Sequence, residues 1–142
     1  MFKNYDPGRI VVSFNGVIIQ GFASGTFVKA ERDNDTFTKV YGAHGDVGRV
    51  RSRKRGGKVT ITLMGISPSN DVLSGFVATD ELTGLGGVGA IQIEDLQGTS
   101  LVHGTNAWVT RPANYEAGDD LSNREWVIDC DDLDMLIGGE LA

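Results

Sequence analysis

The sequence predicts a mainly β fold with one helix. Its 142 residues include 20 glycines and only three prolines, as expected of a fold with many turns and bends. Short runs that alternate apolar and polar side chains recur along the chain, and Asn15-Gly16 separates two of them. With 40% hydrophobic, 23% charged and 8% aromatic residues, the composition excludes a disordered, collagen-like or coiled-coil protein.

The predicted strands follow from this alternation and from the turn residues. Asn15-Gly16 is the dipeptide that best accepts the positive φ angles of a type I′ turn, so a hairpin is expected there. Residues 58–64 form the clearest strand, because Val59, Ile61 and Leu63 point to one face and threonines to the other. The segments predicted as strands are 9–14, 17–22, 26–31, 36–41, 58–64, 90–96, 100–111 and 124–132.

One helix is predicted over about residues 69–82. Residues 67–71 supply capping and first-turn side chains, and Gly84 is placed to end the helix. The apolar stripe of this helix consists of Val72, Leu73, Phe76 and Val77. A short apolar element is expected at 135–137. Because we find no internal repeat or linker, a single domain is expected over residues 1–142.

The last long strand is expected to pack on the core through one face only. Trp126, Ile128 and Cys130 share that face, while the other face carries Val127, Asp129 and Asp131. Trp126 and Trp108 both have aliphatic neighbours. We therefore expect both tryptophans in the core or at a subunit interface, rather than stacked on nucleic-acid bases.

Positive charge is concentrated in one segment. Five glycines and two valines lie between Tyr41 and Lys58, so an exposed, extended loop or hairpin arm is expected over about residues 43–58. Six of the 13 bases of the chain fall within ten of these residues, with no acid among them. These bases are Arg49, Arg51, Arg53, Lys54, Arg55 and Lys58.

Negative charge gathers near the C-terminal end. Residues 116–134 contain eight acids and one base, Arg124, and the formal charge of the whole chain is −6. This balance disfavours double-stranded DNA binding through phosphate neutralisation. Each charged segment is expected to meet an opposite charge, on nucleic acid, another protein or another copy of the chain. The acids expected to complement the arm are Glu116, Asp119, Asp120, Asp129, Asp131, Asp132 and Asp134.

Two sequence motifs resemble ligand sites but lack an essential part. Residues 84–89 fit the pattern G-x-G-x-x-G, yet they follow a helix and precede a strand, the reverse of the order that binds a dinucleotide phosphate. Residues 129–134 resemble half of a calcium loop, but Leu133 and Asp134 stand where an oxygen ligand and a glycine are needed. Neither motif is expected to bind its ligand.

No catalytic, cofactor or metal site is predicted elsewhere. His44, His103 and Cys130 lack metal-ligand or catalytic spacing. The single cysteine cannot form an internal disulfide, residues 1–6 lack signal-peptide features, and no apolar run approaches the ~20 residues of a membrane span. We expect a protein that folds in a reducing, aqueous compartment, has no membrane partner and is not an enzyme.

The order of these elements resembles that of the tail-tube proteins of contractile-tailed bacteriophages and prophages. Nearly the whole chain shares in the resemblance. The stretches that carry it are Tyr5-Asp6-Pro7, Val12-Ser13-Phe14-Asn15-Gly16-Val17, Gly21-Phe22-Ala23-Ser24-Gly25-Thr26-Phe27-Val28, Ser67-Pro68-Ser69-Asn70-Asp71-Val72-Leu73 and Arg124-Glu125-Trp126. None of them is a catalytic signature.

The resemblance implies a small antiparallel β-sandwich or barrel with one flanking helix and a long arm. It further implies homohexameric rings that stack head to tail into a hollow tube, with each arm on a neighbouring ring. The contracting sheath would lie outside the tube, the tape-measure protein and transiting DNA inside, and the baseplate and tail terminator at its ends. The protein would be part of the virion, assembled in the bacterial host cytoplasm, without a cofactor, metal or specific DNA binding.

Three alternatives remain open at this stage. A subunit of a secretion-type delivery tube would share the fold and the ring plan. A nucleic-acid-binding module would use the basic arm directly, although no aromatic side chains alternate with its bases. An enzyme is disfavoured, because no nucleophile, base and orienting partner can be named.

Overall fold

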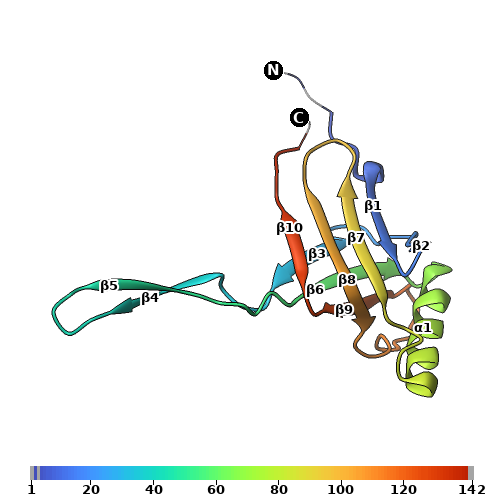
Figure 1. Ribbon diagram of the computed structural model, residues 1–142. Coiled ribbons are helices and arrows are strands. Elements are labelled where there is room, and N and C mark those ends of the chain that lie inside the picture. Colours follow the sequence, from blue (N-terminus) through green and yellow to red (C-terminus); the bar gives the residue numbers. More distant parts are fainter. Residues whose placement is uncertain (1, 3, 141–142) are drawn as a thin grey trace.

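The computed structural model describes residue 2 and residues 4–140. One bent antiparallel sheet and a helix form a body, and a separate hairpin projects from it (Figure 1). We call residues 33–56 the arm and the remainder the body. The elements are η1 (Pro7–Arg9), β1 (Ile10–Phe14), β2 (Val17–Ile18), β3 (Val28–Arg32), β4 (Phe37–Tyr41), β5 (Val47–Arg51), β6 (Gly57–Met64), α1 (Ser69–Thr83), β7 (Gly89–Asp95), β8 (Leu101–Val109), β9 (Asn123–Cys130) and β10 (Leu133–Leu136).

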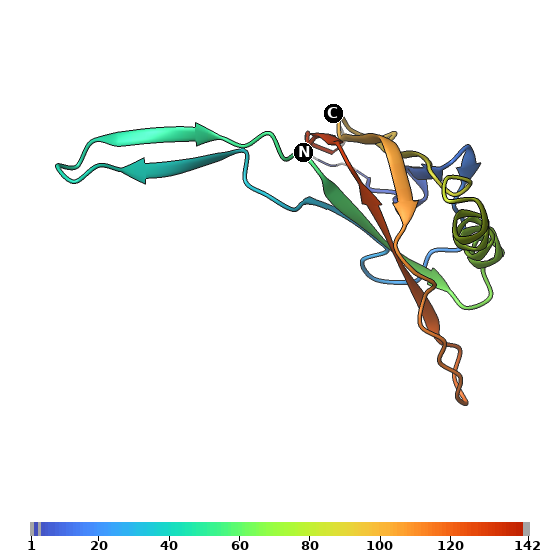
Figure 2. The ribbon, with the colours of Figure 1, turned by 60° about the horizontal axis from the view of Figure 1, so that its bottom comes forward.

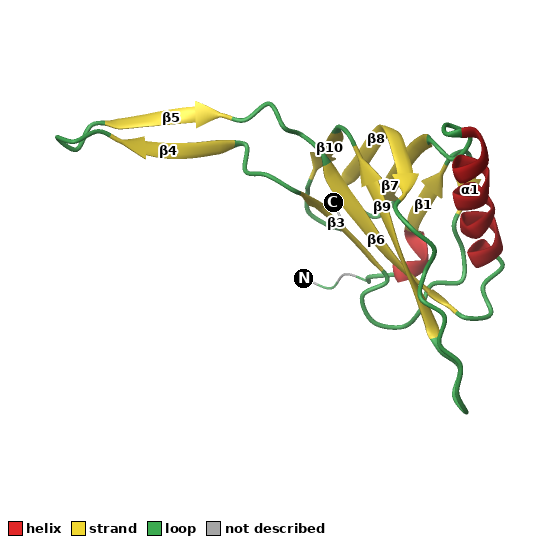
Figure 3. Cartoon of the chain, turned by 90° about the horizontal axis from the view of Figure 1, so that it is seen from below, coloured by secondary structure: helices red, strands yellow, loops and turns green. Residues whose placement is uncertain are grey.

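The body sheet bends at β8, where two strands share one edge. Its order is β2-β1-β7-β8-β9-β6-β3, and β10 also pairs with β8. Residues 101–104 of β8 pair with β10, whereas 107–109 pair with β9. The two halves of the sheet therefore face each other across the core (Figure 3). The predicted mainly β, antiparallel fold with one helix is confirmed, and β10 includes part of the apolar element expected at 135–137.

Local sequence patterns account for the hairpin and the central strand. Asn15 and Gly16 have φ angles of 50° and 81°, as a type I′ turn requires. In β6, Val59, Ile61 and Leu63 are fully buried while the threonines between them are half-buried. Both predictions are confirmed, because each depends on residues adjacent in sequence.

The strand predicted at 17–22 is shorter than expected. Only Val17–Ile18 pairs as β2, because the main chain of Gln20 instead bonds to the start of the helix. The Gln20 carbonyl accepts from the Ser67 hydroxyl at 2.5 Å, and its N–H donates to Ser69 Oγ at 2.9 Å. Two serines predicted to serve the helix start thus also hold the first hairpin against it.

Helix α1 covers the end of the body opposite the arm (Figures 1 and 3). It buries Leu73 and Val77, and the Phe76 ring meets Phe14 edge-on with centroids 5.3 Å apart. Gly84 ends the helix at φ 80°, which confirms its predicted position. Among residues 2 and 4–140, no helix has the length and apolarity needed to span a bilayer.

Asn70 joins the helix to two strands. Its side-chain oxygen accepts from the Trp126 indole N–H at 2.9 Å, and its amide donates to the carbonyls of Met64 at 2.9 Å and Ser67 at 3.1 Å. Trp126 is only 3% exposed, so its predicted place in the core is confirmed. Trp108 is half-buried.

The arm differs most from the sequence prediction. Strands β4 and β5 pair only with each other, every one of their residues is exposed, and the hairpin extends far from the body (Figure 2). The strand predicted at 36–41 therefore belongs to the arm, which begins earlier than residue 43, and Lys58 lies in body strand β6. The alternation at 36–41 arises from the two solvated faces of a hairpin rather than from a core-facing strand.

Replacing Asn70 with alanine is expected to lower the free energy of unfolding by about 1–3 kcal/mol, because the buried Trp126 N–H loses its acceptor. Urea unfolding of the subunit measures this difference. Glu81→Ala, an exposed change on the same helix, is expected to stay within about 0.5 kcal/mol of the unaltered protein. Equal effects of the two variants would contradict the anchoring role of Asn70.

Candidate assembly interface

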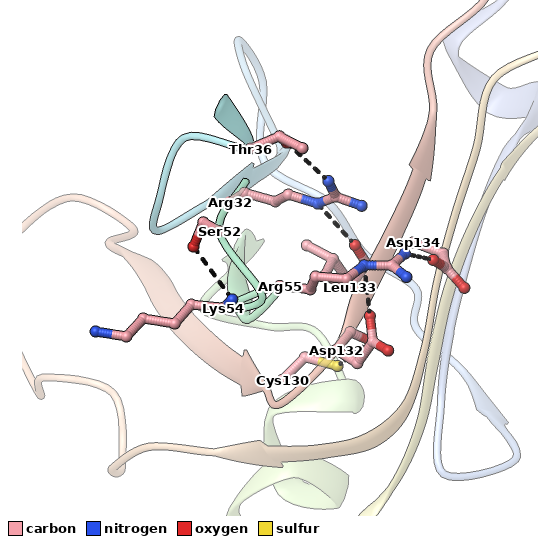
Figure 4. A network of polar contacts seen from close by, with 9 residues as sticks. All are labelled: Arg32, Thr36, Ser52, Lys54, Arg55, Cys130, Asp132, Leu133 and Asp134. Carbon is pink, nitrogen blue, oxygen red and sulfur yellow. Dashed lines mark hydrogen bonds and ion pairs between the residues drawn. The ribbon is translucent and has the colours of Figure 1, made fainter. Parts of the chain in front are cut away.

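The arm leaves the body at a corner built around Leu133 (Figure 4). The Leu133 N–H donates to the Arg55 carbonyl at 2.9 Å, and its own carbonyl accepts from Arg32 Nε at 3.0 Å. Its side chain is fully buried, with Cδ2 close against Gly57. One residue at the start of β10 therefore holds both the segment that enters the arm and the segment that leaves it.

Two of the predicted bases are paired within the chain. The Arg55 guanidinium contacts Asp134, and its Nε lies 3.3 Å from Asp132 Oδ1 (Figure 4). Lys58 Nζ lies 3.6 Å from Glu31 Oε1. These side chains are about half exposed, so each pair contributes only about 0–1 kcal/mol. The pairs therefore orient the base of the arm more than they stabilise the fold.

The acids that the sequence groups in one segment lie at two separate places. Strand β9 spans Asn123–Cys130 and divides them. Asp129, Asp131, Asp132 and Asp134 lie at the corner where the arm begins, whereas Glu116, Asp119 and Asp120 lie on the loop between β8 and β9. A contact between any of these acids and the arm of another copy stays a prediction.

The arm has two chemically different faces. Directly paired residues of an antiparallel hairpin point to the same side, so the register assigns every residue of β4 and β5 to a face. The cationic face carries Phe37, Lys39, Tyr41, Val47, Arg49 and Arg51. The neutral face carries Thr38, Val40, Gly48 and Val50. On the cationic face, the Arg49 guanidinium lies 3.9 Å from the centroid of the Phe37 ring.

Sequence reasoning missed the cationic contribution of Lys39 and the aromatic side chains beside it. The available signal was the glycine-containing turn that makes 36–41 and 47–51 a hairpin. There the Gly42 N–H donates to the Asp46 carbonyl at 2.7 Å, and Gly45 has φ 90°. Once this turn is recognised, the pairing of the two segments follows.

The side chains considered for chemistry do not form a site. His44 lies in the turn of the arm, His103 in β8 and Cys130 in β9. Burial raises the pKa of the Cys130 thiol, and its Sγ donates to the Asp132 carbonyl at 3.2 Å. Within the described residues, no three His, Cys, Asp or Glu side chains gather to hold a metal ion. Residues 84–88 lie between α1 and β7, and Gly89 is the first residue of β7, so this motif follows a helix and precedes a strand as predicted.

The pKa of the Asp129 carboxyl differs from its ordinary value. Burial, followed by the nearby Asp33 carboxylate, raises the pKa of Asp129, while Lys58 acts in the opposite direction. The folded state thus holds this proton more tightly than the unfolded chain does. The resulting cost to folding is absent below the ordinary aspartate pKa and is complete once the pH exceeds the raised pKa.

Residues 11–138 match the family described as Bacteriophage PhiTE tail tube protein. The chain belongs to this family. Structural protein ORF10 of Pseudomonas phage KPP10 is 28% identical over 144 residues, which cover 96% of this chain and 83% of that protein. The chain is therefore a phage structural protein of the tail tube type, as its sequence resemblance implied.

Solved structures of contractile injection systems share the fold of this tail tube protein. The sheath/tube terminator of the extracellular system PVC superposes with a TM-score of 0.66 at 17% identity, covering 96% of this chain and 99% of the other. The tube terminating cap of the anti-feeding prophage gives 0.65 at 12% identity, covering 96% and 93%. A chain of the PVC sheath-tube complex gives 0.63 at 16% identity, covering 94% and 91%.

Replacing Arg55 with alanine is expected to loosen the base of the arm with little loss of overall stability. The amides of Asp33 and Leu133, which bond across the corner, should exchange hydrogen faster, while the free energy of unfolding falls by at most about 1 kcal/mol. Hydrogen exchange read by mass spectrometry measures the first effect. Lys54→Ala, the matched loss of a neighbouring base, should leave both amides unchanged, and equal exchange in both variants would refute the orienting role of Arg55.

Replacing Asp129 with asparagine is expected to raise the free energy of unfolding at about pH 7, because the cost of ionising this carboxyl disappears. At about pH 3, below the ordinary aspartate pKa of about 3.9, the gain should shrink towards zero. Urea unfolding at the two pH values measures the change. Glu125→Gln removes the same charge from an exposed position on β9 and serves as the control. The same pH dependence of the free energy of unfolding in both variants would contradict a cost of ionisation specific to Asp129.

Proposed function

We propose that this tail tube protein forms rings of six subunits that stack head to tail into the hollow tail tube, through which phage DNA passes into the host. The observation that carries the proposal is an arm with no core of its own. All ten residues of β4 and β5 are exposed, and an isolated two-stranded hairpin is only marginally stable in water. The body of another copy supplies the missing partner.

The placement of the arm favours stacking over closed pairing. It projects from one end of the body, while the helix lies at the other (Figure 1). When the arm of one copy docks on a different surface of the next, the contact is heterologous and can repeat without limit along an axis. This is the polarity that a tube of identical rings needs.

The face of the body sheet that points away from the core suits a channel for DNA. Strand alternation puts two bases and five acids on this face. They are Lys29, Lys58, Glu31, Glu94, Glu125, Asp129 and Asp134. If this face lines the channel, its negative balance repels phosphates, so transiting DNA is not retained.

The proposal includes the partners of such a tube. The sheath surrounds it, the tape-measure protein and then the DNA occupy its channel, and the baseplate and tail terminator close its ends. Two of the structural neighbours are a sheath/tube terminator and a tube terminating cap. This likeness makes an end cap the second candidate function. Negative-stain electron microscopy of the purified protein separates the two, since tube subunits form long stacks and a cap forms single rings.

Shortening the arm should abolish long tubes without unfolding the body. Ser52 N–H donates to the Thr36 carbonyl at 2.8 Å, so replacing residues 37–51 with Asn-Gly would close a two-residue turn between them. We expect the circular dichroism spectrum and the thermal unfolding of this variant to match those of the full-length chain. Negative-stain microscopy should show only single subunits, single rings or short stacks of rings. Normal tubes from this variant, beside those of the full-length chain, would show that the arm is not needed for stacking.

A further inference from the structure

We infer that the cationic face of the arm docks on the acidic loop tip, residues 116–120, of a second copy of the chain. The inference rests on the proposed self-assembly and names the surface that receives the arm. Three lines of observation support it: the composition of the arm face, the state of the acids on the loop, and the distance between the two within one chain.

The cationic face combines three bases with exposed aromatic surface. Lys39, Arg49 and Arg51 point to the same side as Phe37 and Tyr41, whose exposed fractions are 44% and 64%. Within the described residues, none of the three bases has an acid within ion-pair distance. A partner surface for this face therefore needs negative charge beside some apolar contact area.

The loop tip offers the complementary charge. Glu116, Asp119 and Asp120 are exposed, no base interrupts residues 116–120, and no ion pair to another described residue involves them. The loop is braced at its neck, because the Ser122 hydroxyl donates to the Glu116 carbonyl at 2.8 Å. Three exposed negative charges therefore lie within five residues, equal in number to the three bases of the cationic face.

The surroundings of the loop supply room for side chains of a partner. A cleft of about 260 Å³ lies at its base, lined by Thr110, Arg111, Pro112, Ala113, Asn114, Glu116, Asn123, Glu125 and Val127. Its wall is mainly polar, with two carboxylates, one base and a few apolar side chains. The carboxylates can pair with the bases of the cationic face, and the apolar side chains can contact its aromatic rings.

The acids at the corner where the arm begins are already bonded within the chain or are half-buried. Asp132 and Asp134 contact Arg55 in the same chain, and Asp131 accepts from the Asn106 side chain at 3.2 Å. Asp129 is half-buried and lies near Lys58, which lowers its pKa against the larger effect of burial. The loop tip is therefore the favoured acidic surface for an incoming arm.

The two complementary surfaces cannot meet within one chain. The arm joins the body beside the end of β9, where Gly57 pairs with Cys130, and the acidic loop leads into the start of β9, where Asn123 pairs with Met64. The seven residue steps from Asn123 to Cys130 separate these ends by about 24 Å. The arm then extends away from the loop rather than toward it (Figures 2 and 3). Only a second copy can bring the charges together.

Charge reversal tests this pairing. The arm variant carries Lys39→Glu, Arg49→Glu and Arg51→Glu, and the loop variant carries Glu116→Lys, Asp119→Lys and Asp120→Lys. Each alone is expected to cut tube formation by about tenfold or more in negative-stain counts, because like charges then oppose each other. A chain that carries both sets should recover tubes. A mismatched chain, with the arm reversal plus Asp71→Lys, Glu81→Lys and Glu140→Lys at exposed positions elsewhere, has the same net charge and should not.

A covalent readout covers the case in which no tubes form. An Arg49→Cys chain mixed with an Asp119→Cys chain should give a disulfide-linked dimer on mild oxidation, whereas Arg49→Cys with Glu81→Cys should not. Cross-linking without any ring or tube overturns the tube function and supports the docking. If the unaltered chain forms tubes, any one of three results overturns the docking and leaves the tube function in place. These results are normal assembly of the loop variant, no recovery of tubes in the chain that carries both sets, and no specific cross-link.

Discussion

The structure depends on how the arm, which has no hydrophobic core, is attached to the body, which contains the core. Leu133 makes this attachment. Its side chain is buried in the core, its N–H donates to the Arg55 carbonyl and its carbonyl accepts from Arg32 Nε, so it bonds to both segments at the base of the arm. Gly57 permits the approach, since a Cβ there would lie 2.5 Å from the Glu31 carbonyl oxygen and 2.7 Å from Leu133 Cδ2. The direction of the arm is therefore set by core packing, and the exposed pairs of Arg55 only refine it.

That direction determines what the charges of the chain can do. Because the arm leaves from one end of the β6–β9 pair and the acidic loop from the other, attraction between them cannot be satisfied inside one subunit. Opposite charges that cannot pair within one subunit can pair between two subunits, and their positions then favour one relative orientation of the two. In the proposed assembly, polarity would therefore originate in the topology of a single strand pair.

Much of the body could be predicted from the sequence because its signals are local. The turn at Asn15-Gly16, the alternation in β6 and the end of α1 at Gly84 each depend on residues close along the chain. The first strand of the arm could not be placed, since Phe37, Lys39 and Tyr41 alternate as they would in a strand on a core. These residues differ from those of a body strand because β4 packs on no other layer within the described part of the chain. That difference is a property of the tertiary structure.

The candidate interface was predictable only in part for a similar reason. The six clustered bases mark the arm by composition alone, but two of them, Arg55 and Lys58, are paired inside the chain. The acids appear as one run in the sequence, and only the length of β9 reveals that they occupy opposite ends. The bend of the sheet was also invisible, because it requires β9 and β10 to share one edge of β8.

The bases of the arm also disfavour unwanted pairing between the arms of different subunits. An exposed hairpin presents two open strand edges, which invite pairing between the arms of different subunits. Three bases on one face make two arms repel each other, while a surface that carries acids still accepts them. Exposed ion pairs contribute only about 0–1 kcal/mol each. In the proposed docking, most of the binding free energy would therefore come from burial of side chains such as Phe37 and Tyr41, at roughly 25 cal/mol per Å². Charge would select the partner surface, and apolar burial would keep the arm there.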